Sequence, residues 1–356
     1  MVPGTHSKWV SRKGLLSRGE VATIFKKGTG TLLWVLIGLA LIFAFINGFR
    51  DSSSIMAGVI SSHALPPRLA RYICGVAEFA APFLFGIAVA KSITTDLVDP
   101  SIISLETITM AIAAALIWTI FAWLIGIPSS SSHSLVGGIL GAVLLVDGPQ
   151  AIIYSGLYKV ILPLFLAPIL GFAAGYVIMN LIFLATMHAT PKVNNHFRHL
   201  QIVTMIGLAL SHSANDAQKS MGVITLGLIL AGKISSFDVP LLVVLACAAA
   251  IGFGASRGDW RLMRTLGQKI YVVRPVNALA SQVGSSLVIF ISALIGAPVS
   301  TSQVVSMALV GAGSAERVSK VHWQVSRDML TTWVLTIPIT MFIAAIFEEL
   351  AVTLHF

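Results

Sequence analysis

The chain has 356 residues, of which 56% are hydrophobic and only 10% are charged. This balance excludes a soluble globular protein, and the apolar runs are too long and unbroken for the alternating strands of a β-barrel. The formal net charge of +9 falls mainly in a basic tail and short loops, not in an aromatic-rich patch that would bind nucleic acid. We therefore expect an all-α polytopic protein that crosses the cell membrane several times.

The first half of the chain is predicted to hold a basic N-terminal tail, residues 1–30, and a first transmembrane repeat, residues 31–187. In chain order its parts are a span over 31–64 broken by polar residues, a basic turn at 66–71, a span over 72–90, an acidic loop at 91–106, apolar arms at 107–126 and 134–146 joined by a Pro-Ser tip at 128–133, and a span over 160–187.

A cytoplasmic linker, residues 188–200, is expected to lead into a second repeat, residues 201–356. Its parts follow the same order: a broken span over 201–232, a turn at 233–238, a span over 239–255, a basic loop at 256–274, arms at 276–297 and 304–312 joined by a Pro-Ser/Thr tip at 298–303, a loop at 313–328 and a last span over 329–352. The shared order indicates an internal repeat.

The two tips carry no full charge and combine a proline with hydroxyl residues, which is typical of re-entrant hairpins. If each pair of arms enters and leaves on one side, each half makes three full crossings, and an odd number inverts the second half relative to the first. Inverted repeats with broken helices are a transporter architecture. Parity also places the basic loops at 192–198 and 257–274 on one side, which we expect to be cytoplasmic, and the basic tail on the other.

Two polar segments interrupt the apolar pattern at matching places, residues 47–58 and residues 211–228. Asp51 in the first corresponds to Asp216 in the second, 165 positions later. Ionisable groups inside a spanning segment are expensive and mark ion or substrate pathways. The sequence therefore predicts a transporter site built from both halves.

The tips are predicted to bind an anion. A helix that begins inside the membrane exposes unpaired N–H groups and a partial positive charge, and serine and threonine hydroxyls add donors. Such a site suits a tetrahedral oxyanion. The tip residues concerned are Ser130, Ser131, Ser132, Ser300, Thr301 and Ser302.

Asp51 and Asp216 would repel an oxyanion unless a cation lies between them. A sodium ion held by carboxylate, amide and hydroxyl oxygens, or a proton on a carboxyl, would neutralise the site and couple the anion to an ion gradient. Alternatively, an unprotonated carboxylate could accept a hydrogen bond from the P–OH of hydrogen phosphate, which sulfate at pH 7 does not offer.

The segment Ser-Ala-Asn-Asp-Ala-Gln-Lys-Ser-Met-Gly at 213–222 resembles the second-repeat signature of the inorganic phosphate transporter (PiT) family, typically HGANDxQKxMG. Both tips resemble the paired P-x-S-T-T-H motifs of that family. The resemblance implies a homodimer that takes up phosphate together with sodium or protons and needs no cofactor. Besides the tip hydroxyls, it implies substrate contacts from Gln218 and Lys219, and ion coupling by Asp51, Asp216 and Asn215, which would hold the sodium. From their positions in the first polar segment, we also expect Arg50 to contact substrate and Asn47 and Ser54 to take part in ion coupling.

Four positions depart from the family pattern: Arg50 for Asn or His, Ser54 for Asn, Gln303 for His and Gln282 for Glu. Arg50 adds a fixed positive charge beside Asp51, so we expect the cation site of the first repeat to be lost or weakened, with Arg50 neutralising Asp51 or contacting the anion. The second repeat, which keeps Asn215 and Asp216, is then expected to retain its cation.

Three other functions remain to be weighed. Sulfate is another tetrahedral oxyanion that helix N-termini and hydroxyls would accept. An anion channel would explain the anion sites but not the paired carboxylates. An enzyme is not expected, because the sequence has no H-E-x-x-H motif and the two aspartates of its polar segments, Asp51 and Asp216, sit on opposite repeats.

Overall fold

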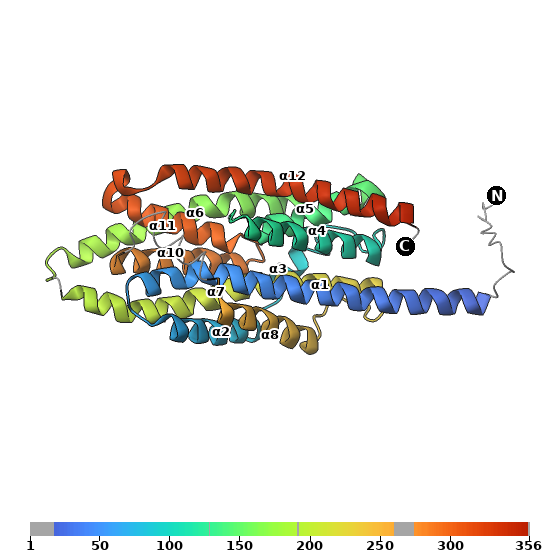
Figure 1. Cartoon of the computed structure of the whole chain (residues 1–356), viewed down its shortest axis with the longest axis horizontal. Coiled ribbons are helices and arrows are strands. Elements are labelled where there is room, and N and C mark those ends of the chain that lie inside the picture. Colours follow the sequence, from blue (N-terminus) through green and yellow to red (C-terminus); the bar gives the residue numbers. More distant parts are fainter. Residues whose placement is uncertain (1–17, 128, 191, 260–273, 355–356) are drawn as a thin grey trace.

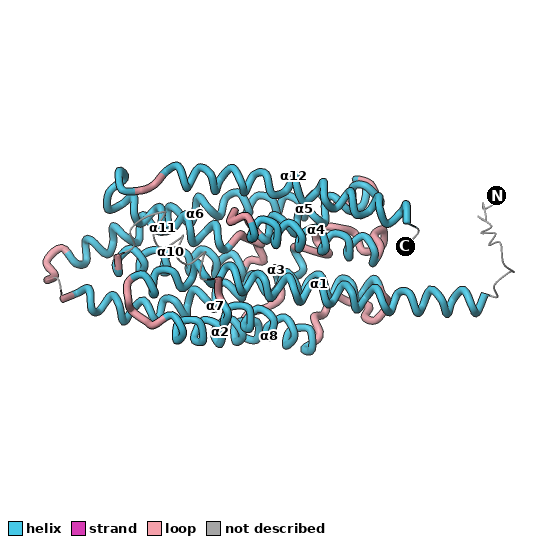
Figure 2. Tube along the Cα trace, in the orientation of Figure 1, coloured by secondary structure: helices cyan, strands magenta, loops and turns pink. Residues whose placement is uncertain are grey.

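The computed structural model describes residues 18–354 except for 128, 191 and 260–273 (Figure 1). This part of the chain is helical, and its only extended pairing is an isolated bridge between Val98 and Ile152 (Figure 2). The helices are α1 (Arg18–Ser61), α2 (Pro67–Leu84), α3 (Ala88–Ser92), α4 (Leu105–Leu124), α5 (Ser131–Val146), α6 (Tyr154–Thr186), α7 (Val193–Leu230), α8 (Leu241–Arg257), α10 (Pro275–Leu294), α11 (Thr301–Arg317) and α12 (Trp323–Leu354).

Five segments in the described part are long and apolar enough to cross a membrane: Gly30–Ser61, Leu105–Leu124, Tyr154–Thr186, Pro275–Leu294 and Ser326–Ala351. Together with the shorter apolar helices α5 and α8, they confirm the multi-pass, all-helical membrane fold.

The two halves run in opposite directions. In Figure 1, α1 runs from the right end of the molecule to the left, whereas its counterpart α7 runs from left to right. The hairpin of α4 and α5 occupies the right half of the view, and the hairpin of α10 and α11 occupies the left half. The predicted inverted repeats and re-entrant hairpins are therefore confirmed.

Helix contacts follow the same symmetry. Helix α5 packs along α12, and its counterpart α11 packs along α6; likewise α1 packs on α8 while α2 packs on α7. Glycines permit the closest of these approaches, because a side chain on Gly141 would strike the carbonyl of Met341 and one on Gly175 would strike that of Ala308. Each half thus binds its hairpin to the last span of the other half, and this interlocking holds both tips at the centre.

The predicted breaks at the two polar segments are wrong, because α1 and α7 run through residues 47–58 and 211–228 without interruption. Neither segment contains proline, and many of their polar side chains find partners on other helices, so the backbone ladder has no reason to open. The helix breaks lie at the tips instead, where α5 begins after Ser130 and α11 after Ser300.

Several boundaries also differ from the prediction. Residues 18–30 of the expected tail belong to α1, α2 begins at Pro67 inside the expected turn, α7 begins at Val193 inside the expected linker, and α11 and α12 occupy most of the expected loop at 313–328. Proline at the first position of α2 explains one of these, because its missing N–H costs nothing there. Residues 1–17 and Pro128 lie outside the described residues.

Candidate functional site

The polar segments of α1 and α7 meet the two hairpin tips in the interior of the bundle. Almost every predicted site residue is buried there, with at most 5% of its surface exposed. The exceptions are Ser54 and Ser302, which are partly exposed. A cluster of this polarity needs internal partners, because each unpaired buried group costs about 1–3 kcal/mol.

Lys219 connects the two tips. Its Nζ donates hydrogen bonds to Asp216 Oδ1 at 2.6 Å, to Ser132 Oγ at 2.6 Å and to the carbonyl of Val299 at 3.2 Å. Ser132 in turn donates to the same carbonyl at 2.8 Å. The three protons of the ammonium therefore join α7, the first tip and the second tip at one point.

Asn215 holds the second tip to α7. Its side-chain amide donates to the carbonyl of Ala297 at 3.1 Å and accepts from the N–H of Val299 at 3.4 Å. Thr301, the first residue of α11, donates to Asp216 Oδ1 at 3.3 Å. Because both polar ends of Asn215 are occupied by backbone, its contacts favour a supporting role over the predicted sodium ligation.

Arg50 reaches from α1 to the first tip. Its Nη2 donates to the carbonyl of Ser129 at 3.1 Å and to Ser129 Oγ at 3.4 Å, while its Nε has no hydrogen-bond partner among the described residues. The recorded bonds thus run to the tip and not to Asp51. Of the two roles expected for Arg50, contact with a bound anion fits this placement better than neutralisation of Asp51.

The two helix N-termini differ in their caps. Ser130 caps α5, accepting from the N–H of His133 at 3.2 Å and lying 2.7 Å from His133 Nδ1, and Gln303 of the other tip approaches the same nitrogen at 3.4 Å. Ser300 precedes α11 without a side-chain cap. Ser302 is only partly buried, which makes it the weakest of the six predicted tip contacts.

Three buried carboxylates surround His212. Its Nδ1 lies 3.1 Å from Glu78 Oε1, and its Nε2 lies 3.7 Å from Asp216 Oδ2 and 4.0 Å from Asp51 Oδ2. Glu78, on α2, was not predicted as a site residue. Its only signal in the sequence was a single acidic residue inside the apolar span at 72–90, a feature that marks functional sites in membranes.

The cluster suits a cation. One ligand atom each from Asp51, His212 and Asp216 lie within 4.8 Å of one another. In the described part of the chain, Asp51 Oδ2, Asp216 Oδ2 and both polar atoms of the Asn47 amide are buried without a hydrogen-bond partner. Carboxylate and amide oxygens left unpaired in this way are the donors that a hard cation takes.

The side chain of Gln218 bonds to α3 and to its own helix. Its Oε1 accepts from the N–H groups of Val89 and Ala90 at 2.9 and 3.2 Å, and its Nε2 donates to the carbonyl of Ala214 at 2.6 Å. The amide is therefore engaged in holding α3 against α7. These contacts favour a structural role for Gln218 over contact with substrate.

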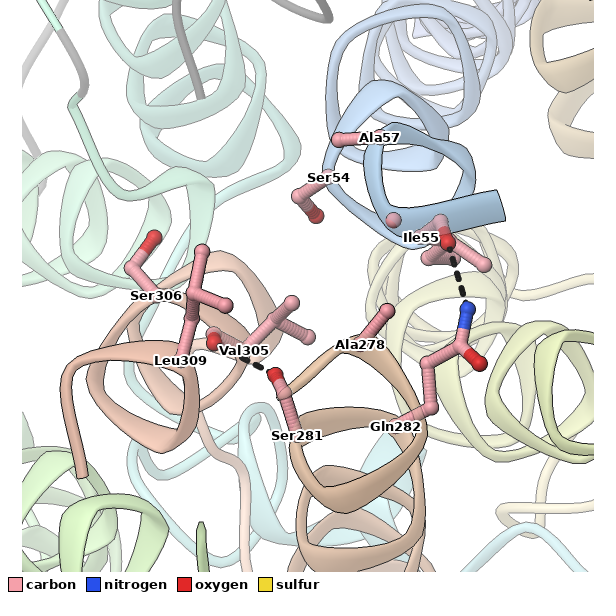
Figure 3. Close-up of a pocket in the computed structure, with 10 residues that line it drawn as sticks. Ser54, Ile55, Ala57, Ala278, Ser281, Gln282, Val305, Ser306 and Leu309 are labelled. Carbon is pink, nitrogen blue, oxygen red and sulfur yellow. Dashed lines mark hydrogen bonds between the residues drawn. The ribbon is translucent and has the colours of Figure 1, made fainter. Parts of the chain in front are cut away.

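Ser54 lies on the side of α1 that faces α10 and α11. Its hydroxyl donates to the carbonyl of Asp51 at 2.6 Å, and it lines a cavity of about 30 Å³ (Figure 3). Gln282 closes part of this cavity, donating to the carbonyl of Ile55 at 3.3 Å and accepting from Thr204 at 2.7 Å. The glutamine at position 282 thus bridges α1, α7 and α10 without adding a charge.

Comparison with known proteins agrees with this architecture. The family model described as "Phosphate transporter family" matches residues 47–193 and 184–344, one match for each repeat. A solved structure described as "The sodium-dependent phosphate transporter" superposes with a TM-score of 0.84 at 22% identity, covering 90% of this chain and 98% of that one.

Two bacterial relatives are similar to the chain over nearly its full length. The chain is 40% identical to a "Probable low-affinity inorganic phosphate transporter" of Bacillus subtilis, covering 89% of this chain and 95% of the relative. It is 36% identical to a protein of Rhizobium meliloti with the same description, covering 88% and 95%. With both repeats matched and the inverted fold in place, this chain belongs to the phosphate transporter family.

Proposed function

We propose that this chain carries inorganic phosphate into the cell in symport with a cation, and that phosphate binds between the two hairpin tips. The observation that carries the proposal is the meeting of the N-termini of α5 and α11 at Lys219, with Arg50 of α1 bonded to the first tip. Two helix N-termini and two cationic side chains form an environment that attracts an oxyanion. The names of the bacterial relatives support phosphate as that anion.

A count of formal charges supports cation coupling. With His212 counted as neutral, the carboxylates of Asp51, Glu78 and Asp216 outnumber the cations Arg50 and Lys219 by one before the phosphate arrives. A buried, uncompensated charge is strongly unfavourable, and the anion adds to it. A cation bound at Asp51 and Asp216 offsets this charge, so the two solutes favour each other's binding.

Sodium is the coupling cation that we propose, with oxygens from Asp51, Asp216 and Asn47. The unpaired state of these buried atoms supports it, as does the sodium dependence stated in the name of the similar solved structure. His212, placed among three carboxylates, offers a site for a proton as the competing choice. Coupling to sodium and coupling to protons predict different responses of phosphate uptake to imposed sodium and proton gradients.

The cavity beside Ser54 supports a transporter over an anion channel. Its volume of about 30 Å³ accommodates one or two water molecules but not a phosphate ion. Gly58 of α1 lies close to Ala278 of α10 along its wall. If phosphate passes between α1 and the hairpin of α10 and α11, these helices must therefore separate, which is a conformational change and not an open pore.

Purified protein in liposomes tests the proposal directly. Labelled phosphate uptake is measured with an inward sodium gradient at equal pH, and separately with an inward proton gradient without sodium. We expect accumulation with sodium. Accumulation with protons alone would identify the proton as the coupling ion, with His212 as its site. Uptake under neither gradient would contradict the proposed function.

Two further measurements address substrate and assembly. Sulfate at tenfold excess should leave labelled phosphate uptake unchanged, since sulfate at pH 7 has no O–H group that can donate a hydrogen bond to a carboxylate; strong competition would favour a broader oxyanion carrier. The homodimer implied by the family resemblance stays a prediction, and light scattering of the purified protein checks it.

A further inference from the structure

A groove of about 590 Å³ lies on the outside of the bundle between α2 and α8, away from the tips. Its floor is bare backbone, because Gly75 and Gly252 face each other and a side chain on either would lie 2.8 Å from the carbonyl oxygen of the other. The glycines thus bring α2 and α8 close together along the floor, and the larger side chains on either side form the walls.

The walls of the groove are apolar and face outward. Tyr72, Val76 and Phe253 are 68%, 70% and 55% exposed, and Phe79 is 41% exposed. In a membrane protein such a surface contacts lipid chains. The shape therefore suits an unbranched hydrocarbon chain better than a compact polar solute.

One end of the groove is cationic. Arg68 and Arg71 stand at the start of α2, and Arg257 stands at the end of α8 with its guanidinium 5.0 Å from the centre of the Phe253 ring. Arg71 donates to the carbonyl of Arg257 at 3.1 Å. Within the described ranges, no ion pair with a carboxylate is recorded for these three arginines.

The cationic end lies at the level expected for lipid headgroups. In Figure 1, the start of α2 and the end of α8 point toward the left end of the molecule, where α6 ends and α7 begins. Lys192 and Arg198 of the basic linker region belong to that end. Basic residues mark the cytoplasmic side of a membrane protein, where anionic lipids gather.

We propose that this groove binds an anionic phospholipid, with the phosphate at Arg68, Arg71 and Arg257 and one acyl chain over Gly75 and Gly252. Inorganic phosphate alone would leave the apolar walls unused. A second copy of this chain is disfavoured, because a symmetric contact through this face would bring two sets of three arginines together.

Native mass spectrometry of the purified, delipidated full chain tests the site. Phosphatidylglycerol and phosphatidylcholine are titrated separately, and we expect tighter binding of phosphatidylglycerol. The double variant Arg68→Gln/Arg257→Gln should weaken phosphatidylglycerol roughly tenfold or more, given the usual contribution of each basic residue near an anionic surface. Arg71 is left intact because it also supports the end of α8.

A second variant separates shape from charge. Val76→Trp fills the groove without changing its charge and should weaken both lipids, while Arg198→Gln, an exposed arginine on α7 at the same end, serves as the matched control and should bind like the wild type. Melting temperatures in detergent verify that all variants are folded.

Three results would overturn the assignment. The first is unchanged phosphatidylglycerol binding by Val76→Trp. The second is displacement of the lipid by millimolar inorganic phosphate, which would indicate a site for the inorganic anion. The third is efficient cross-linking of Tyr72→Cys between two protomers, which would assign the face to a second copy.

Discussion

The polar segment of α7 and its counterpart in α1 differ in what their paired side chains hold, although both contain buried atoms without a hydrogen-bond partner in the described structure, among them Asp216 Oδ2, Ser220 Oγ and Thr225 Oγ1 in α7. In α7, Ser213, Asn215, Gln218 and Lys219 each bond to another part of the chain: the carbonyl of Glu78, the second tip, α3 and both tips. In α1, Asn47, Ser52 and one oxygen of Asp51 are buried without hydrogen-bond partners in the described structure. The α7 segment therefore holds both tips and α3 in place, whereas in the α1 segment it is Arg50 that bonds to a tip.

This difference bears on the position of the cation. The sequence favoured the second repeat, because it keeps the Asn-Asp pair of the family. In the structure, however, Asn215 is bound to tip backbone and Asp216 Oδ1 is bound to Lys219 and Thr301. Asp51 and Asn47 carry fewer bonds, so we expect the α1 side to supply most of the cation's ligands and Asp216 to supply one oxygen.

The largest effect is expected from Lys219→Met. The change leaves Asp216 buried without its ammonium partner and separates the tips, so we expect a loss of about 3–5 kcal/mol in the free energy of unfolding and no measurable uptake. Thermal melting and liposome uptake measure the two effects. Lys233→Met, in an exposed turn, is the matched control and should change neither.

A double variant distinguishes charge from shape at this position. Lys219→Met/Asp216→Asn removes both charges and should recover much of the unfolding free energy without recovering uptake. If Lys219→Met alone melted like the wild type, the view of α7 as the segment that holds the site together would be wrong.

The paired substitutions Asp51→Asn and Asp216→Asn compare the two segments directly. Asp51→Asn removes a weakly bonded carboxylate, so stability should stay close to the wild type while sodium-dependent uptake falls roughly 10–100-fold, the worth of one charged ligand. Asp216→Asn should lose uptake and stability together, because Lys219 loses its partner. Equal loss of stability in both variants would contradict the assigned difference.

The general plan of the fold could be predicted from the sequence. The order of apolar runs and the two Pro-Ser/Thr tips indicated inverted repeats with hairpins. The length of each apolar run and the number of crossings in each half can both be read from the sequence itself. The prediction of breaks in α1 and α7 was wrong because it depended on contacts between distant residues. Whether a polar side chain opens a helix depends on partners such as Ser132 and Val299, which lie far away in the sequence.

The residues of the site were easier to predict than their roles. Asp51, Asp216, Lys219, Ser132 and Thr301 lie together in the interior, whereas Ser302 is partly exposed and Glu78 carried too weak a signal among apolar neighbours. The roles of Gln218 and Asn215 could not be separated by residue type, since an amide can bind a solute or a backbone. Only the positions of α3 and the second tip decide between these uses.

Arg50→Gln should have a smaller effect than the carboxylate variants. It removes a positive charge at the first tip while keeping a donor for Ser129, so the phosphate concentration for half-maximal uptake should rise roughly tenfold, as expected for the loss of one charge-assisted contact. Uptake measured across phosphate concentrations checks this. An unchanged half-maximal concentration would indicate that the guanidinium only supports the tip.

The smallest effects concern the two adjacent hydroxyls of the second tip. Thr301→Val removes a bond to Asp216 Oδ1 while preserving volume, and we expect uptake to fall roughly threefold to tenfold, because a single hydrogen bond to a charged group is lost. Ser302→Ala, at a partly exposed position with no recorded contact to the cluster, should stay within about twofold, since surface substitutions have small effects. If Ser302→Ala were the more harmful change, the substrate would have to approach the outer side of α11. The meeting of both tips at Lys219 would then be a structural junction beside the phosphate site and not the site itself.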